Sequence, residues 1–170
     1  MHFLLRSIGE YAALVFANVL NLKGALLIVA SRVRFMVRKC VMESTGMIAV
    51  NLESAAVKAA LGMSKDFSEL SISCYNSAID CAASGPLWQL RAFKDYLDAE
   101  VHCKNVLLTV PFGYHSPAMT PLLDDLTLVA KQVTLRAPTI PVISNVLGEV
   151  VLPGDDSVFI PEYFARQAGI

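Results

Sequence analysis

The chain has 170 residues, of which 55% are hydrophobic and 17% are charged, and its formal net charge is −1. This length suits one domain of ordinary size with a substantial core. The near-neutral charge gives no basic surface for nucleic acid or for an anionic membrane, so it argues against both as partners. The mean hydropathy of +0.52 predicts extensive burial, such as a parallel sheet covered on both faces.

The cysteines and the longest apolar region bear on the cellular compartment. The four cysteines are Cys40, Cys74, Cys81 and Cys103. They form no Cys-X-X-Cys pair and have no histidine at metal-ligand spacing, so we expect reduced, mostly buried thiols and no metal site. The apolar region 12–30 is interrupted by Asn18, Asn21 and Lys23, which favours two buried helices over a membrane span. Since the N-terminus also lacks a signal-peptide pattern, we expect a cytoplasmic protein.

Ser7 is the first residue in the chain with a candidate chemical role. It lies between a short apolar segment, residues 3–5, and a run with helical character. A serine in a sharp turn between strand and helix forms a nucleophile elbow, in which the next backbone N–H faces a developing oxyanion. Gly9 leaves room for the helix to pack closely on the strand. The alternative is a serine that caps the helix N-terminus, and the local pattern leaves both interpretations open.

Two helices are predicted next, at about 9–19 and 25–40, with a break at 21–24. Apolar residues of the second helix recur at spacings of three and four and predict its buried stripe: Leu26, Val29, Val33, Met36 and Val37. We expect Arg34, Arg38 and Lys39 to form a solvated face. Arg32 lies beside the predicted stripe and is the basic residue that can point inward.

The pattern changes after residue 45 to short alternating elements. The predicted elements are strand 47–51, helix 53–61, strand 70–75, a turn at 76–77, strand 81–84, helix 86–99 and strand 105–110. This β-α-β-β-α-β order is the split ferredoxin-like arrangement. Residues 46–111 are therefore predicted to form a small subdomain inserted between two parts of a larger one.

The chain continues with an irregular segment that contains His115. We then expect a helix at 121–133, a proline-introduced strand at 138–146, a hairpin or loop at 148–156 and a helix at 161–167. A lone loop histidine is usually a surface or structural residue. A serine hydroxyl needs a base before it can attack an acyl group, so His115 is also the candidate partner of Ser7.

Six segments of the chain resemble motifs of malonyl-CoA:acyl-carrier-protein transacylases, in the order and spacing of that family. They are residues 7–14, 31–36, 46–50, 74–77, 110–116 and 141–146, and include Ser-Ile-Gly-Glu-Tyr and Gly-Tyr-His-Ser. The chain is most similar to the acyltransferase domain of iterative type I polyketide synthases of the fungal non-reducing kind. The resemblance implies a partial α/β-hydrolase-like acyltransferase core at 1–45 and 112–170, with the ferredoxin-like subdomain inserted at 46–111.

The resemblance also implies roles for individual residues. Ser7 matches the nucleophile that carries the acyl group as an ester, and His115 matches the base that activates it. Arg32 matches the arginine that grips the free carboxylate of malonyl in a bidentate pair. The backbone N–H of Ile8 matches an oxyanion donor.

Three further positions match the family at the edge of its site. The backbone carbonyl near Asn145 matches the group that orients the histidine. Tyr114 matches a bulky aromatic residue of malonyl-selective members. Asn76 is at a motif position near the cleft, although a turn-forming role between strands explains it equally well.

The implied activity is transfer of malonyl from malonyl-CoA to the phosphopantetheine thiol of an acyl carrier protein, in polyketide biosynthesis. No bound cofactor is implied, and the partners would be the carrier protein and neighbouring synthase domains. One alternative is a non-catalytic, truncated or degraded relative. It is favoured by Leu5 and Arg6, where the family has glycine and histidine, and by the lack of a counterpart to the family's Gly-Gln-Gly loop. The other alternative is a serine esterase on the same elbow.

Overall fold

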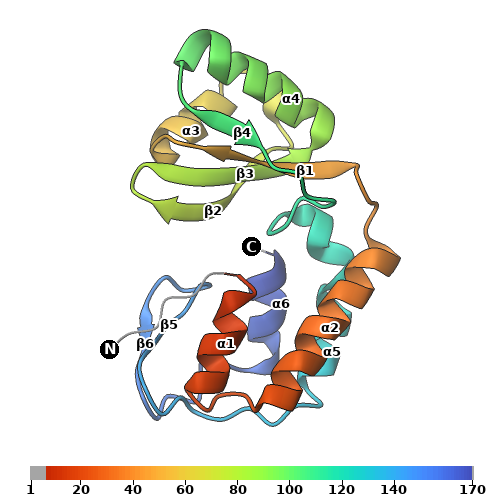
Figure 1. Ribbon diagram of the computed structural model, residues 1–170, viewed down its shortest axis with the longest axis vertical. Helices are drawn as coiled ribbons and strands as arrows, with labels where there is room; N and C mark the ends of the chain where they lie inside the picture. The colour runs from red at the N-terminus through yellow and green to blue at the C-terminus, as the bar shows by residue number, and fades with distance from the viewer. Residues whose placement is uncertain (1–6, 170) are drawn as a thin grey trace. The chain divides into compact units, whose positions relative to one another are not determined.

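A computed structural model describes residues 7–169 of the chain (Figure 1). The described residues divide into two compact units, one formed by residues 7–39 with 121–169 and the other by residues 40–120. The predicted strand at 3–5, with Leu5 and Arg6, lies outside the described residues. The first unit thus combines segments from both ends of the chain.

The first unit consists mainly of helices. Its elements are α1 (Gly9–Phe16), α2 (Leu22–Lys39), α5 (Leu123–Ala130), β5 (Val142–Ile143), β6 (Val150–Val151) and α6 (Pro161–Gly169), and the short helix η3 (Pro117–Leu122) leads into α5. Helix α5 packs against both α2 and α6. Figure 1 shows α1 beside α6, and the rings of Tyr11 and Phe164 meet between them at 5.7 Å. This packing brings α1 against α6, which lies about 150 residues later in the sequence.

Helix α2 buries a different face from the one that the apolar pattern predicts. Leu26, Val33 and Val37 are 59%, 45% and 59% exposed, whereas Ala25 and Ile28 are buried. The close contact between α2 and Val133 depends on a small residue, because a Cβ atom at Gly24 would lie 2.4 Å from Cγ1 of Val133. Of the five residues predicted to form the buried stripe of α2, only Met36 is buried and Val29 is half-buried, so the predicted stripe is wrong at the other three. The inward position of Arg32 is confirmed, since this residue is only 2% exposed.

The second unit is a four-stranded antiparallel sheet with two helices. In chain order it contains β1 (Thr45–Val50), α3 (Ser54–Leu61), η1 (Lys65–Phe67), β2 (Ser71–Ser77), β3 (Asp80–Pro86), α4 (Leu87–Tyr96), η2 (Leu97–Val101) and β4 (Asn105–Leu107). The strand order across the sheet is β2-β3-β1-β4. Ile48 of the central strand β1 lies opposite Ala83 on one side and Leu107 on the other.

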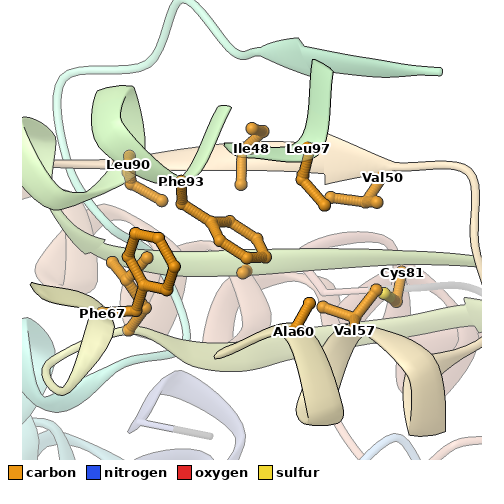
Figure 2. Packing of buried hydrophobic residues seen from close by; sticks show 11 residues of the cluster. Ile48, Val50, Val57, Ala60, Phe67, Cys81, Leu90, Phe93 and Leu97 are labelled. Carbon is orange, nitrogen blue, oxygen red and sulfur yellow. The ribbon is translucent and has the colours of Figure 1, made fainter. Parts of the chain in front are cut away.

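One face of this sheet carries the core of the second unit. Buried residues from β1 and β3 meet those of α3 and α4, which places both helices on the same face (Figure 2). Phe93 of α4 is fully buried, and its ring meets the ring of Phe67 edge-on at 5.1 Å. Leu90 and Phe93 of α4 and Leu97 of η2, which recur at helical spacing in the sequence, are all fully buried.

Several sequence-based expectations of strand structure are wrong. Every strand pair within residues 7–169 is antiparallel, so the expected parallel sheet is not found there. A high apolar content shows that side chains are buried, but it does not specify strand direction.

Asn76 lies within β2 instead of forming a turn, and the turn falls at residues 78–79. The predicted strand 138–146 shrinks to Val142–Ile143, which pairs with Val150–Val151 in a small hairpin.

Three further observations concern the compartment and metal binding. Cys81 is buried, but the other three cysteines are only half-buried. Residues 7–169 contain no group of three or more histidine, cysteine or acidic side chains that could hold a metal ion. None of the described helices combines the length and the apolar character needed to cross a membrane.

Candidate active site

Ser7 adopts a backbone conformation that side chains disfavour. Its φ angle is +52°, in the left-handed region, which costs an L-residue about 1–2 kcal/mol. The N-cap of α1 is Ile8, with no side-chain cap, so the interpretation of Ser7 as a helix cap is wrong. Strained non-glycine residues cluster at functional sites. The sharp turn at Ser7 is thus the geometry expected of a nucleophile elbow.

Hydrogen bonds hold the Ser7 backbone on both sides. Its N–H donates to Oδ1 of Asn145 at 2.9 Å. Its carbonyl accepts from Nε2 of Gln167 at 2.7 Å and from the backbone N–H of Glu10 at 3.1 Å. The turn is therefore fixed by α1, by the loop after β5 and by α6.

Arg32 is a buried cation that has no acidic partner among residues 7–169. Its Nη1 donates to Oε1 of Gln167 at 2.8 Å, and its Nε has no hydrogen-bond acceptor among residues 7–169. The ion pairs found in that range all involve lysines. Burying an uncompensated charge is costly, and the cost is relieved when an anion binds. Arg32 is therefore suited to receive a carboxylate from a ligand.

The Tyr11 hydroxyl lies close to this guanidinium. Tyr11 is 4% exposed, and its buried hydroxyl meets the hydrogen-bond criteria with none of the described residues. Burial raises the pKa of Tyr11, and the positive charge of Arg32 opposes that rise. Tyr11 thus places a second buried polar group beside Arg32, with which it interacts.

Glu10 joins α1 to the loop that contains Asn145. Its Oε1 accepts from the backbone N–H of Asn145 at 2.9 Å and from the hydroxyl of Tyr163. Ser144 lies 2.9 Å from the same tyrosine hydroxyl and accepts from the N–H of Leu147. Burial raises the pKa of Glu10. This carboxyl therefore supports Asn145, which in turn holds Ser7.

The segment around His115 belongs to the second unit and is anchored on its sheet. His115 has a φ of +54° and is 9% exposed. Ser84 of β3 donates to the carbonyl of Tyr114 at 3.0 Å, and Thr45 of β1 accepts from the N–H of Gly113 at 2.9 Å. A Cβ atom at Gly113 would lie 3.0 Å from a backbone carbonyl of β1, so a larger residue there would require the strand to shift by a few tenths of an ångström. The residues just before His115 are therefore anchored on the sheet, and the histidine itself is buried in a strained backbone conformation, unlike an ordinary surface loop residue.

The remaining predicted site residues differ in their settings. Ile8 is 51% exposed at the N-terminus of α1, where backbone N–H groups lack partners within the helix. Tyr114 is half-buried, and its ring lies 6.2 Å from that of Phe112. Asn76 is half-buried in β2. Asn145 acts on Ser7 through its side chain, and the predicted role of its backbone carbonyl stays a prediction.

The structure thus brings Ser7, Arg32 and Asn145 together within the first unit, while His115, Tyr114 and Asn76 belong to the second. Sequence reasoning missed Glu10 and Gln167. One feature of the sequence could have pointed to Glu10, because it is a single charged residue within the apolar start of α1. Gln167 had no such feature, because a glutamine is common on any helix surface.

The acyl transferase domain family matches residues 3–166 of the chain. The chain belongs to the acyl transferase domain family. The resemblance drawn from the sequence motifs is confirmed at this level, and the fold is the α/β fold of acyltransferases.

Among curated proteins, the chain is 59% identical over 158 residues to the orsellinic acid synthase ArmB of Armillaria ostoyae, covering 93% of the chain and 7% of that protein. It is 43% identical over 162 residues to an orsellinic acid synthase of Beauveria bassiana, covering 95% of the chain and again 7% of that protein. The chain therefore spans less than a tenth of the length of these relatives.

Among solved structures, the chain is similar to the acyltransferase domain from the second module of the salinomycin polyketide synthase. The TM-score is 0.82 at 31% identity, over 96% of this chain and 36% of that one. It is also similar to the malonyl CoA-acyl carrier protein transacylase from Clostridium perfringens, with a TM-score of 0.84 at 25% identity, over 96% of this chain and 51% of that one.

Proposed function

We propose that the chain is part of the acyltransferase domain of a polyketide synthase, and that it moves malonyl from malonyl-CoA to an acyl carrier protein through an ester on Ser7. The observation that carries this proposal is the buried guanidinium of Arg32. It lacks an acidic partner among the described residues and is connected through Gln167 to the backbone of Ser7. A cation in this position suits an acyl group that bears a free carboxylate.

The proposed chemistry is acyl transfer in two steps. The Ser7 hydroxyl attacks the thioester carbonyl, and His115 takes its proton and then donates it to the departing thiolate of coenzyme A. The Ile8 N–H stabilises the oxyanion of the tetrahedral intermediate, helped by its place at the start of α1. In the second step, the phosphopantetheine thiol of the carrier protein attacks the ester and releases Ser7.

The comparisons support this proposal at the level of the family. The relatives named above are orsellinic acid synthases, and one solved relative is a malonyl transacylase. By extension we propose a carrier protein and neighbouring synthase domains as partners, no bound cofactor and a cytoplasmic location. We also infer that the β-α-β-β-α-β segment is a ferredoxin-like insertion at 46–111, and that Tyr114 and Asn76 border the acyl site.

A serine esterase is less well supported. Hydrolysis of a simple ester needs the elbow but gives no reason to bury beside it an arginine that has no acidic partner among the described residues. We therefore expect acyl groups with a free carboxylate to be preferred over acetyl.

The test is acylation of the purified chain with labelled malonyl-CoA, followed by intact-mass measurement. We expect a malonyl adduct that Ser7→Ala abolishes. An adduct that survives this change would exclude Ser7 as the nucleophile. Arg32→Ala should reduce malonyl loading and spare acetyl loading, and equal losses would remove Arg32 from its carboxylate-binding role.

A further inference from the structure

Gln167 of α6 connects the two groups on which the proposed function depends. It is 2% exposed, its Oε1 accepts from Nη1 of Arg32 at 2.8 Å, and its Nε2 donates to the carbonyl of Ser7 at 2.7 Å. One amide therefore bridges the buried cation and the strained elbow.

The chemistry of the two partners fixes the orientation of this amide. A guanidinium only donates hydrogen bonds, and a backbone carbonyl only accepts them. The amide oxygen must therefore face Arg32 and the amide nitrogen must face Ser7, since the flipped amide would lose both bonds. Glutamine supplies one acceptor and one donor at the required length.

The neutrality of Gln167 is as important as its hydrogen bonds. A carboxylate at this position would form an ion pair with Arg32 and would turn an oxygen toward the Ser7 carbonyl, which is itself an acceptor. The guanidinium would then be neutralised from within the protein. A neutral amide instead orients Arg32 and leaves its charge available to a ligand.

We propose that Gln167 is a positioning and specificity-determining residue, which aligns Arg32 with the Ser7 elbow and reserves its charge for the carboxylate of the incoming acyl group. This inference rests on the proposed function, because it assigns Gln167 a role in the same site. It adds that acyl selectivity depends on a residue of α6 that need not contact the substrate.

The experiment compares Gln167→Glu and Gln167→Met in a Ser7→Ala background, so that binding is measured without acyl transfer. Affinities for malonyl-CoA and acetyl-CoA are determined by calorimetry for each variant. We expect Gln167→Glu to lower the preference for malonyl-CoA by about tenfold or more, as for the loss of a hydrogen-bonded charge pair. Gln167→Met, of similar volume, should lower the preference for malonyl-CoA less, because methionine releases the Arg32 guanidinium without neutralising its charge.

Gln132→Glu provides the matched control. Residue 132 is exposed just after α5, so this change adds the same charge to the same unit without touching Arg32. We expect its preference for malonyl-CoA to equal that of the parent. Thermal unfolding of each variant separates a change of selectivity from a loss of folded protein.

The outcomes distinguish the two proposals. If the wild-type chain forms no adduct on Ser7 and shows no preference for malonyl-CoA, the proposed function fails. If the preference exists but Gln167→Glu lowers the affinity for both thioesters equally, the inference on Gln167 is overturned.

A further readout needs no ligand. Rotation of the Arg32 guanidinium, measured by NMR, should speed up in Gln167→Met, and unchanged rotation would contradict the positioning role.

Discussion

Ser7 holds its left-handed backbone through hydrogen bonds from residues distant in sequence. Asn145 and Gln167 lie 138 and 160 positions away, yet they hold its N–H and its carbonyl. The sequence predicts a sharp turn at this serine from the glycine and helix that follow it. It does not reveal Gln167, because nothing in a helical glutamine indicates which distant backbone atom it will meet.

The strain at Ser7 predicts different effects for two substitutions that both remove the hydroxyl. Glycine adopts a φ of +52° freely and alanine does not. We expect Ser7→Gly to be more stable than Ser7→Ala by about 1–2 kcal/mol in urea unfolding. Neither variant should form a malonyl adduct. Equal stability would mean that the turn is not strained.

Glu10 predicts a pH dependence of stability. Because burial raises its pKa above the ordinary value of 4.5, the folded state holds this proton more tightly than the unfolded state. The resulting stabilisation is complete below about pH 4.5 and is lost as the pH rises through the raised pKa.

Glu10→Gln keeps the shape and stays neutral at every pH. Relative to this variant, the wild type should lose free energy of unfolding in urea titrations as the pH rises above about 4.5 and through the raised pKa of Glu10. Parallel curves for the two proteins would contradict the raised pKa.

At the scale of elements, the sequence predicts the second unit well and α2 poorly. Polar and apolar residues alternate along the strands, and apolar residues recur at helical spacing in the helices. These patterns identify the β-α-β-β-α-β order and the buried face of α4, because large apolar side chains form that core. In α2 the buried face is set by Gly24, Ala25 and Arg32, which an apolar pattern does not select. Only the contacts of α2 with other segments reveal this face.

Phe93 tests the core of the second unit. Its side chain is fully buried against Phe67 and the sheet, so Phe93→Ala should cost about 3–5 kcal/mol. The only tryptophan, Trp88, lies on the same helix and reports this unfolding by fluorescence. Val106→Ala, at a site 54% exposed in β4, should change stability by less than about 0.5 kcal/mol. A similar effect of both changes would argue against this core.

For the whole molecule, net charge and exposed apolar surface together determine the tendency to self-associate. The sequence pI is about 6.3, and residues such as Leu26 and Val37 of α2 leave apolar side chains exposed. Near the pI, little charge repulsion opposes their association.

We therefore expect self-association of the isolated chain to be greatest near pH 6.3 and to fall as the pH rises toward about 8. Static light scattering across this range measures it. Val37→Lys should reduce the scattering at pH 6.3, since it breaks the apolar surface of α2. Scattering independent of both pH and this substitution would contradict the prediction.

The pairing of α1 with α6 has a consequence for biosynthesis. Gln167 follows Ser7 by 160 residues, so at about 5–20 residues per second a ribosome needs roughly 10–30 s to deliver the second after the first. Residues 40–120 form a contiguous unit that can fold during this interval. The nascent serine therefore waits without its bond to α6 until translation has passed that helix, and only then can the hydrogen bonds around the elbow be completed.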